Sequence, residues 1–370
     1  METITQWITS INDVLWTYIL VIMLLGCAVW FTIKTRFVQF RMFKEMVRLL
    51  GDSTSKAEGK EHHISSFQAF AVSLASRVGT GNLAGVATAI TVGGPGAVFW
   101  MWLIAFFGMM TNFTENVLGI YYRRRNKDGE WSGGAMYYLR DGLGSKKGCK
   151  HVGKVLAVLF AVFTLLASFG IGAMGQVNKI VVNIESAFQI PALSNVVLYE
   201  GVNLYMLIIG LLLVALAAAI TLGGLKRVAA FAEKVVPFMV VLFIVGSIVI
   251  VGINYANIVP AFKAIFVTAF SPMAAVGGAA GAAIKTCMVQ GFKRGVFSNE
   301  AGLGSSVMVH SNSNVKEPVK QGMWGIFEVF ADTMIVCTLT ALVVLTSGLY
   351  NLDTGVLVEG VTDATLVANA

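Results

Sequence analysis

The chain has 370 residues, of which 56% are hydrophobic and only 13% are charged. Apolar runs of about 20 residues recur along it, a pattern that excludes a soluble domain and indicates an all-α integral membrane protein with several spans. The net charge of +7 does not indicate a nucleic-acid partner, because Lys and Arg concentrate in loops on one side of the predicted membrane.

The first predicted span covers about residues 14–33 and is followed by a basic loop. By the positive-inside rule this loop is cytoplasmic, which places the N-terminus outside. The basic residues of the loop are Lys34, Arg36, Arg41, Lys44, Arg48, Lys56 and Lys60.

The second predicted span, at about residues 65–92, contains a stretch that does not suit a helix. Its centre reads Gly79-Thr80-Gly81-Asn82, and each glycine costs a helix about 1 kcal/mol relative to alanine. In hydrocarbon, backbone groups released from a helix must find partners in protein or in a water-filled cavity. A membrane helix that breaks at its centre is therefore expected to line a site.

The direction of the chain assigns chemistry to this break. The half-helix that ends near Val78 directs free carbonyls at the break, which suit a cation. The half-helix that begins near Gly81 directs free N–H groups there, which suit a carboxylate. We therefore predict a site for a small zwitterion with a companion ion.

Four further spans follow in the first half of the chain, at about residues 97–122, 152–187, 202–222 and 228–253. The loop after residue 122 is strongly basic and is expected on the inside, whereas the loop before residue 202 contains Glu200 and no basic residue. Within the inner loop, Trp131 and residues 136–139 are typical of a segment at the level of the lipid headgroups.

From about residue 262 the chain returns inward through a second span, which glycines interrupt at residues 276–281. We predict that an inner loop with Lys293 and Arg294 follows, and then a last full span at about residues 323–345. Five spans run from the first broken segment to residue 253, so the second broken segment enters the membrane in the opposite direction. Two inverted, interrupted helices are typical of a secondary transporter with an inverted repeat and a midplane site.

Several motifs resemble those of the alanine/glycine:cation symporter family, the bacterial sodium:alanine symporters. They are GPGAVFWMW at residues 94–102, RVGTGN at 77–82, GGAMYY at 133–138, GVFSNEAGLG at 295–304, and Asp332-Thr333 with Cys337-Thr338 downstream. The resemblance covers nearly the whole chain. It implies a LeuT-like inverted-repeat fold, with an extra N-terminal helix and a basic loop (1–64), a first five-helix repeat (65–253) and a second, truncated repeat (262–370).

The same resemblance implies sodium-driven uptake of a small neutral amino acid, alanine or glycine, across the inner membrane of a bacterium. It implies neither an enzymatic activity nor a cofactor besides the coupling sodium ion, and we expect a monomer in the lipid bilayer. We count the extra helix and seven core helices, and residues 361–370 resemble the start of the eighth. We therefore expect a reading frame that continues past Ala370 with three more hydrophobic segments, and we expect the 370-residue chain alone neither to transport nor to fold stably.

The substrate site is expected to combine both interrupted spans with a glutamine from the third core span. The predicted residues are Thr80, Gly81, Asn82, Gln176, Gly277, Gly278 and Ala279. For sodium, the resemblance to the LeuT-like arrangement implies the backbone carbonyls of Ala75 and Val78, with partner ligands on the missing eighth helix.

Each of these residues also has a structural interpretation. Thr80 and Asn82 suit the N-cap of the second half-helix. Gly277 and Gly281 have an ordinary spacing for close helix packing. A buried Gln176 pairs as well with a neighbouring backbone group as with a substrate carboxylate.

Charges at membrane depth are the remaining signal, because such residues usually face the protein interior and pair. Arg77 precedes the break, and Glu328 and Asp332 share one face of the last full span. Both a buried structural ion pair and a gate or ion-coupling relay agree with this pattern.

The rival function is an ion channel or pore-forming subunit, which two inverted breaks within one chain disfavour. A membrane-embedded hydrolase is weaker still, because the chain has no HExxH or GxSxG pattern.

Overall fold

The computed structural model describes residues 2–51, 64–127, 129–199, 201–270, 280–352, 354–358 and 365–370. In these ranges the fold is almost entirely helical, and six helices are long and apolar enough to cross a membrane. The six are Thr5–Lys34, Ala97–Tyr122, Lys150–Ala187, Leu204–Thr221, Gly224–Ile253 and Pro318–Thr346. The all-α membrane class predicted from composition is confirmed.

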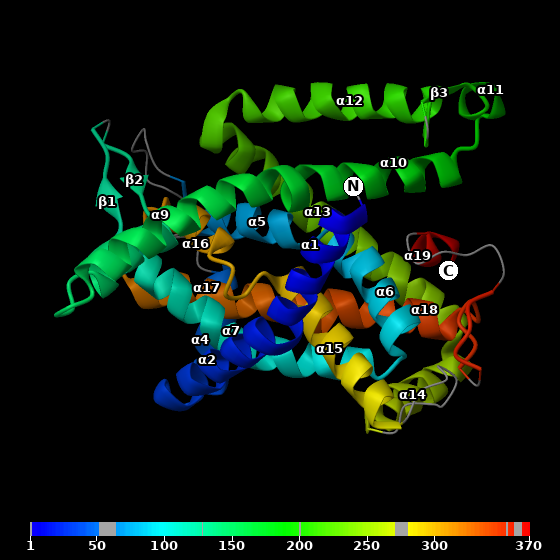
Figure 1. Cartoon of the computed structure of the whole chain (residues 1–370), viewed down its shortest axis with the longest axis horizontal. Helices are drawn as coiled ribbons and strands as arrows, with labels where there is room; N and C mark the ends of the chain where they lie inside the picture. Colours follow the sequence, from blue (N-terminus) through cyan, green and yellow to red (C-terminus); the bar gives the residue numbers. More distant parts are fainter. Residues whose placement is uncertain are drawn as a thin grey trace.

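A central bundle holds most of the buried residues (Figure 1). Its helices are α5 (Ser66–Arg77), α7 (Ala97–Tyr122), α15 (Ala280–Asn299), α16 (Ser305–His310), α17 (Pro318–Val329), η8 (Phe330–Cys337) and α18 (Thr338–Thr346). In the most apolar stretch of α7, 61% of the residues are buried, against 6% in the span Lys150–Ala187. The span α7 therefore lies inside the protein. The span Lys150–Ala187 presents its apolar side chains outward, as a lipid-facing helix does.

Small residues allow α7 and α17 to approach each other closely. A Cβ at Gly325 would stand 2.6 Å from the Nδ2 atom of Asn116, so this position accommodates only glycine. The close approach brings the polar side chains of α7 within hydrogen-bonding distance of α17, where the buried polar layers described below form.

The remaining helices surround this bundle. They are α1 (Glu2–Val14), η1 (Leu15–Leu20), α2 (Val21–Lys34), α3 (Val38–Arg41), α4 (Phe43–Gly51), α9 (Lys150–Ala167), η5 (Ser168–Met174), α10 (Gly175–Ala187), α12 (Leu204–Thr221), α13 (Gly224–Ile253) and α14 (Ile258–Phe270). In Figure 1, α12 and α10 run side by side along one side of the molecule. On the bundle side, α13 packs against α5 through Ala229, Ala232 and Val236.

Short elements connect these helices. They are β1 (Arg124–Arg125), β2 (Trp131–Ser132), α8 (Ala135–Tyr137), η4 (Tyr138–Leu143), α11 (Pro191–Ser194), β3 (Val197–Tyr199), β4 (Val202–Asn203), η6 (Tyr255–Asn257) and α19 (Leu366–Asn369). The two strand pairs, β1–β2 and β3–β4, are both antiparallel.

The first predicted break is confirmed. A capping box at Ser65 and Gln68 starts α5, which ends at Arg77. The helix resumes with η3 (Gly81–Gly85) and α6 (Val86–Gly93). Between the two halves, Val78 has an extended backbone with φ −72° and ψ 94°, so the chain leaves the helix where the Gly-Thr-Gly stretch begins.

The structure has an interruption that the sequence did not predict, at residues 300–304, and we call it the second interruption. The interruption predicted at residues 276–281 lies largely outside the described residues and stays a prediction. Gly277, Gly278 and Ala279 fall outside the described residues. From Ala280 the helix α15 continues to Asn299, and the chain then leaves the helix at residues 300–304 before α16 begins. Glu300, Gly302 and Gly304 adopt left-handed conformations there, with φ of 52°, 94° and 74°, which only glycine takes without strain.

The prediction of an inner loop at Lys293 and Arg294 was wrong, because both residues lie within α15. A lysine can occupy this helix because the N-terminal span supplies partners. The Nζ atom of Lys293 lies 3.4 Å from Asp13, and the Nζ atom of Lys285 donates to the hydroxyl of Tyr18 at 3.0 Å.

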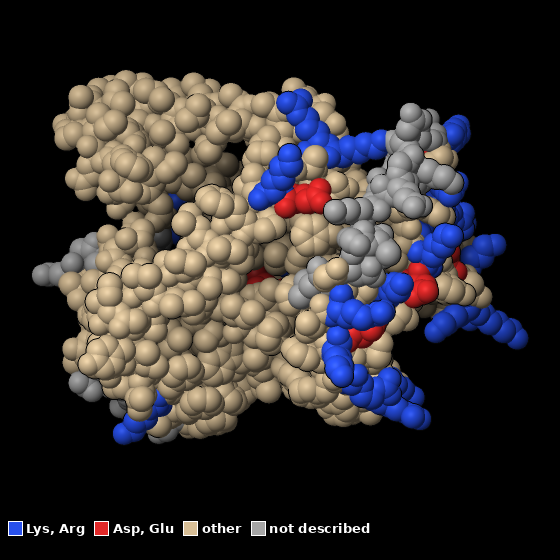
Figure 2. Space-filling view, turned by 180° about the vertical axis from the view of Figure 1, so that it is seen from behind, with Lys and Arg blue, Asp and Glu red and all other residues tan. Residues whose placement is uncertain are grey.

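Basic side chains gather at one end of the molecule (Figure 2). The exposed ones that follow α7 are Arg124, Arg125, Lys127, Arg140, Lys146, Lys147 and Lys150. Arg140 donates to Asp141 and Arg124 pairs with it at 2.9 Å, and the hydrogen bond from Arg140 holds the pKa of the Asp141 carboxyl below its usual value.

Arg123 fastens this end to the loop after α16. Its guanidinium stacks on Trp131 at 4.0 Å and donates to the carbonyls of Ser311 and Ser313. Burial lowers the pKa of Arg123 to about 10. The clamp therefore stays charged at neutral pH and holds the inner end of α7 to the segment that follows the second interruption.

The positions of the basic residues predict the orientation in the membrane. In a cysteine-free background, Arg125→Cys should react with an impermeant maleimide only from the cytoplasmic side, and Asn195→Cys only from outside. Both positions are exposed, so access to the reagent is not limited by burial. The background must lack Cys27, which is itself exposed. Labelling with the two sides exchanged would contradict the orientation.

Candidate functional site

The two interruptions meet at the centre of the bundle. A Cβ at Gly81 would stand 3.3 Å from the Cα of Ser298, the last residue but one of α15. Any larger residue at position 81 would push η3 and the end of α15 apart. The glycine after Thr80 therefore has a packing role in addition to releasing the helix.

Asn82 supports the broken backbone from inside the protein. Its side chain is buried, and its Oδ1 atom accepts a hydrogen bond from the N–H of Gly79 at 2.9 Å. Its Nδ2 atom lies 2.6 Å from the Asp332 carboxylate and 3.1 Å from the Ser298 hydroxyl. Asn82 thus satisfies a backbone group of the break itself and links η3 to α15 and η8. Thr80 occupies the N-cap position of η3, but its side chain makes no capping hydrogen bond.

Asp332 is a fully buried carboxylate surrounded by neutral donors. Its Oδ2 atom accepts from the hydroxyls of Ser298 and Thr333, each at 2.8 Å, while Oδ1 accepts from Asn82. Within the described part of the chain, no Lys, Arg or His forms an ion pair with it. A carboxylate buried at membrane depth is costly without a compensating charge, so this position suits a cation that comes from outside the protein.

Gln176 reaches the break from α10. Its Oε1 atom accepts from the N–H of Thr80 at 3.3 Å, and a Cβ at Gly79 would stand 3.2 Å from the same oxygen. Gln176 therefore contacts two residues of the Gly-Thr-Gly-Asn stretch, Gly79 and Thr80. In this state the glutamine pairs with the backbone, which is the structural alternative left open by the sequence.

A cavity of about 410 Å³ lies next to this cluster, between η3, α10, α13 and α18. Thr80, Lys179, Asn183 and Ser247 are its polar lining residues. The remaining lining residues are apolar or glycine: Leu83, Ala84, Ile180, Phe243, Gly246, Ile250, Val343, Val367 and Ala368. The break thus borders a space of the size of a small organic molecule, most of whose wall is apolar.

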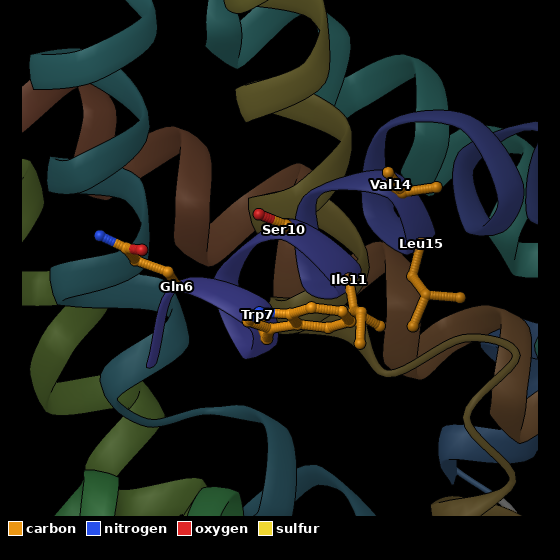
Figure 3. A pocket seen from close by; sticks show the side chains of 6 residues that line it. All are labelled: Gln6, Trp7, Ser10, Ile11, Val14 and Leu15. Carbon is orange, nitrogen blue, oxygen red and sulfur yellow. The ribbon is translucent and has the colours of Figure 1, made fainter. Parts of the chain in front are cut away.

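A second hollow lies on the N-terminal helix and contains no residue of either interruption (Figure 3). It measures about 600 Å³ and is lined by Gln6, Trp7, Ser10, Ile11, Val14 and Leu15, all from α1 and η1. Trp7 is 69% exposed, and none of the lining residues carries a charge. This hollow is an outer face of one helix and does not form part of the site.

On the inner side of the break, the predicted pairing of intramembrane charges is confirmed. The Nη1 atom of Arg77 lies 3.1 Å from Glu328, and both side chains are fully buried. Glu328 also meets the Nε2 atom of His310 at 2.7 Å. The Nδ1 atom of His310 lies 2.5 Å from the Nε2 atom of Gln321.

Glu300 forms a further link at the second interruption. It accepts from Ser76 at 3.2 Å and from Ser305 at 2.5 Å, which joins the end of α5 to the start of α16. The sequence analysis did not single out Glu300 or Ser298 as site residues. The signal was present in Ser298-Asn299-Glu300-Ala301-Gly302, where polar residues and a glycine follow one another as they do at the first break.

The predicted sodium ligands are the backbone carbonyls of Ala75, in the last turn of α5, and of Val78, in the break. Their role stays a prediction. In the described ranges, no group of three or more His, Cys, Asp or Glu residues has the arrangement of a metal centre. Ligands from backbone carbonyls, hydroxyls and a single carboxylate are the kind that a hard monovalent cation uses.

Comparison with known proteins gives one family. The sodium:alanine symporter family matches residues 1–369. The chain is 40% identical to the sodium/alanine symporter AgcS of Methanococcus maripaludis, over 92% of this chain and 70% of that protein. It is 40% identical to a putative sodium/proton-dependent alanine carrier, YrbD of Bacillus subtilis (94% and 65%), and 39% identical to the probable sodium/glutamine symporter GlnT of the same organism (95% and 68%).

The contacts of Asn82 and Gln176 predict their effect on ligand binding. In the full-length protein, Asn82→Ala and Gln176→Ala should each raise the alanine concentration needed for half-maximal uptake, with surface expression kept. A lost hydrogen bond to a charged group costs about 1.5–3 kcal/mol, or about tenfold or more in affinity. The concentration for half-maximal uptake is measured by filtration assays with radioactive alanine at increasing concentrations.

Gln39→Ala is the matched control. Gln39 is a buried glutamine amide on α3 whose side-chain atoms have no hydrogen-bond partner among the described residues. This variant should leave the alanine requirement unchanged. Wild-type uptake in both site variants would show that Asn82 and Gln176 act only in packing and capping.

Proposed function

The chain belongs to the sodium:alanine symporter family, and from that premise we propose that it couples the entry of sodium to the uptake of alanine or glycine. It is a transporter of the membrane and not an enzyme. We place it in the inner membrane of a bacterium, as a monomer with its basic end in the cytoplasm.

The observation that carries the proposal is the buried Asp332 carboxylate beside the broken helix. Sodium is the companion ion that we assign to it, with the hydroxyls of Ser298 and Thr333 turned so that their oxygens face the ion. Each neutral donor to the carboxylate contributes about 1.5–3 kcal/mol, which is comparable with the cost of about 2.5–3.5 kcal/mol for an Asp at membrane depth. The carboxylate is therefore tolerated without the ion, and reversible loading requires this.

The amino acid would occupy the space beside Thr80. Its carboxylate suits the free N–H groups at the start of η3, around Thr80 and Gly81, together with the amides of Asn82 and Gln176. Its ammonium suits the free carbonyls at the end of α5 and at the second interruption. The carbonyls of Ala75 and Val78 remain our proposed ligands for a sodium ion at the end of α5.

We add residues 300–304 to the second half of the proposed site, beside Gly277, Gly278 and Ala279. Residues 300–304 lie close to the first break, and their neighbour Ser298 contacts Asn82. In this proposal, residues 65–253 and 262–370 form the two halves of a LeuT-like inverted repeat.

A small side chain on the substrate fits the cavity better than a long polar one. The relatives are named for alanine and for glutamine. Apart from Thr80, Lys179, Asn183 and Ser247, the described lining of the cavity is apolar. A glutamine carboxamide against these walls would lose hydrogen bonds with water, and a buried polar group without partners is strongly disfavoured.

The proposed role of Asp332 predicts the loss of coupling when its charge is removed. In proteoliposomes with an inward sodium gradient, the wild-type protein should accumulate radioactive alanine above equilibrium. Asp332→Asn should abolish this accumulation, because a neutral amide no longer compensates the charge of the ion.

Asp13→Asn is the matched control, since Asp13 has the same side chain at 61% exposure, away from the break. That variant should still accumulate alanine. Accumulation by Asp332→Asn at the wild-type level would contradict sodium binding at Asp332, and accumulation without a sodium gradient in the wild type would contradict sodium coupling itself.

A further inference from the structure

Two carboxylates of one helix connect to the broken segment, one on each side of the break. Glu328 and Asp332 are separated by one helical turn along α17 and η8. Glu328 pairs with Arg77, the last residue of α5, and Asp332 pairs with Asn82, the second residue of η3. The break is therefore held between an inner layer around Glu328 and an outer layer around Asp332.

The two layers differ in charge. In the inner layer, the positive charge of Arg77 balances the negative charge of Glu328. In the outer layer, Asp332 is negative, and its partners Asn82, Ser298 and Thr333 are all neutral. Among the described residues, Glu328 thus has a cationic partner and Asp332 has none.

Arg77 is close enough to become a cationic partner of Asp332. Its partner Glu328 lies one helical turn from Asp332, a rise of about 5.4 Å that a flexible arginine side chain can span. A protein arginine is always protonated, so an arginine turned toward Asp332 would be a permanent counter-ion.

Two residues prevent this. Glu328 pairs with Nη1 of Arg77 at 3.1 Å, and the Oδ1 atom of Asn112 accepts from Nη2 at 3.1 Å. Asn112 is itself fixed, because its Nδ2 atom donates to the carbonyl of Gly325 at 2.9 Å. The guanidinium is thus held in the inner layer by contacts with α7 and α17.

We propose that Glu328 is a positioning residue for ion coupling: it neutralises Arg77 and holds it away from Asp332, so that the counter-ion of Asp332 has to be a sodium ion from solution. The inference rests on the proposed function, since it assumes that Asp332 binds the coupling ion. Without Glu328, Arg77 competes with sodium for Asp332, and the protein no longer needs the ion.

The charge of Glu328 separates this role from a merely structural one. Glu328→Asp keeps the charge and shortens the side chain, whereas Glu328→Gln keeps the shape and removes the charge. A structural strut would be weakened by both changes. If Glu328 acts by neutralising Arg77, Glu328→Asp should keep the sodium requirement of the wild type and Glu328→Gln should raise it. Removing Arg77 together with the charge of Glu328 should then restore the wild-type sodium requirement.

The test is sodium-dependent thermal stabilisation of the purified full-length protein, measured as the sodium concentration that gives half of the shift. An adjacent Arg lowers the proton affinity of an Asp by about one to three powers of ten, and it should oppose sodium at the same carboxylate in the same direction. Glu328→Gln should therefore raise this concentration at least about tenfold. Glu328→Asp and the double variant Arg77→Gln/Glu328→Gln should stay close to the wild type. Glu233→Gln is the matched control. Glu233, on α13, makes a half-buried contact with Gln68 on α5, the helix that carries Arg77, and this variant should not change the sodium requirement.

An unchanged sodium requirement in Glu328→Gln would overturn the inference, because Arg77 would then not compete for Asp332. A rise in the double variant equal to that in Glu328→Gln would also overturn it, because the pair would then act only by shape. If Glu328→Gln is not obtained as a folded protein, the double variant decides alone: a wild-type sodium requirement supports the inference, and a raised one contradicts it. A wild type that alanine stabilises but sodium does not would instead contradict the proposed sodium coupling.

Discussion

The break at residues 78–80 is the constraint on which the rest of the structure depends, because backbone groups at membrane depth need partners that the bilayer cannot supply. The N–H of Gly79 is satisfied by Asn82 and that of Thr80 by Gln176. These two contacts require η3 and α10 to lie against the break. They also place an amide from each element where a charged ligand would bind, so the groups that stabilise the opened helix are the groups available to a substrate.

Packing decides where polar groups can gather in this fold. The peripheral spans are apolar and largely exposed, whereas more than half of the most apolar stretch of α7 is buried. The small residues of α7 and α17 let polar side chains meet in the interior, as at Gly325 and Asn116. A buried charge at this depth persists only with a partner, and Arg77, Glu328 and His310 meet this condition together. Asp332 meets it only with hydrogen bonds from neutral groups.

Local sequence chemistry was sufficient for the first break, for the contact between Gln176 and that break, and for the pairing of Arg77 with a carboxylate. It did not predict the second interruption, at residues 300–304. Lys293 and Arg294 were interpreted as loop residues because charges are rare in membrane helices, but Asp13 approaches Lys293 from a span that is distant in sequence. Residues 298–302 carried the pattern of a break and were assigned to the inner loop as a result. The link between Asn82 and Asp332 joins positions 250 residues apart, and no local pattern contains such a contact.

Coupling between the two ligands is the central claim, and it is tested most directly by equilibrium binding of radioactive sodium to the purified protein with and without alanine. If the sodium site and the alanine site share Asn82 and the broken backbone, alanine should lower the sodium concentration that gives half-saturation. Because linkage is reciprocal, sodium must then increase the affinity for alanine by the same factor. Sodium binding that does not change at saturating alanine would contradict a common site at the break.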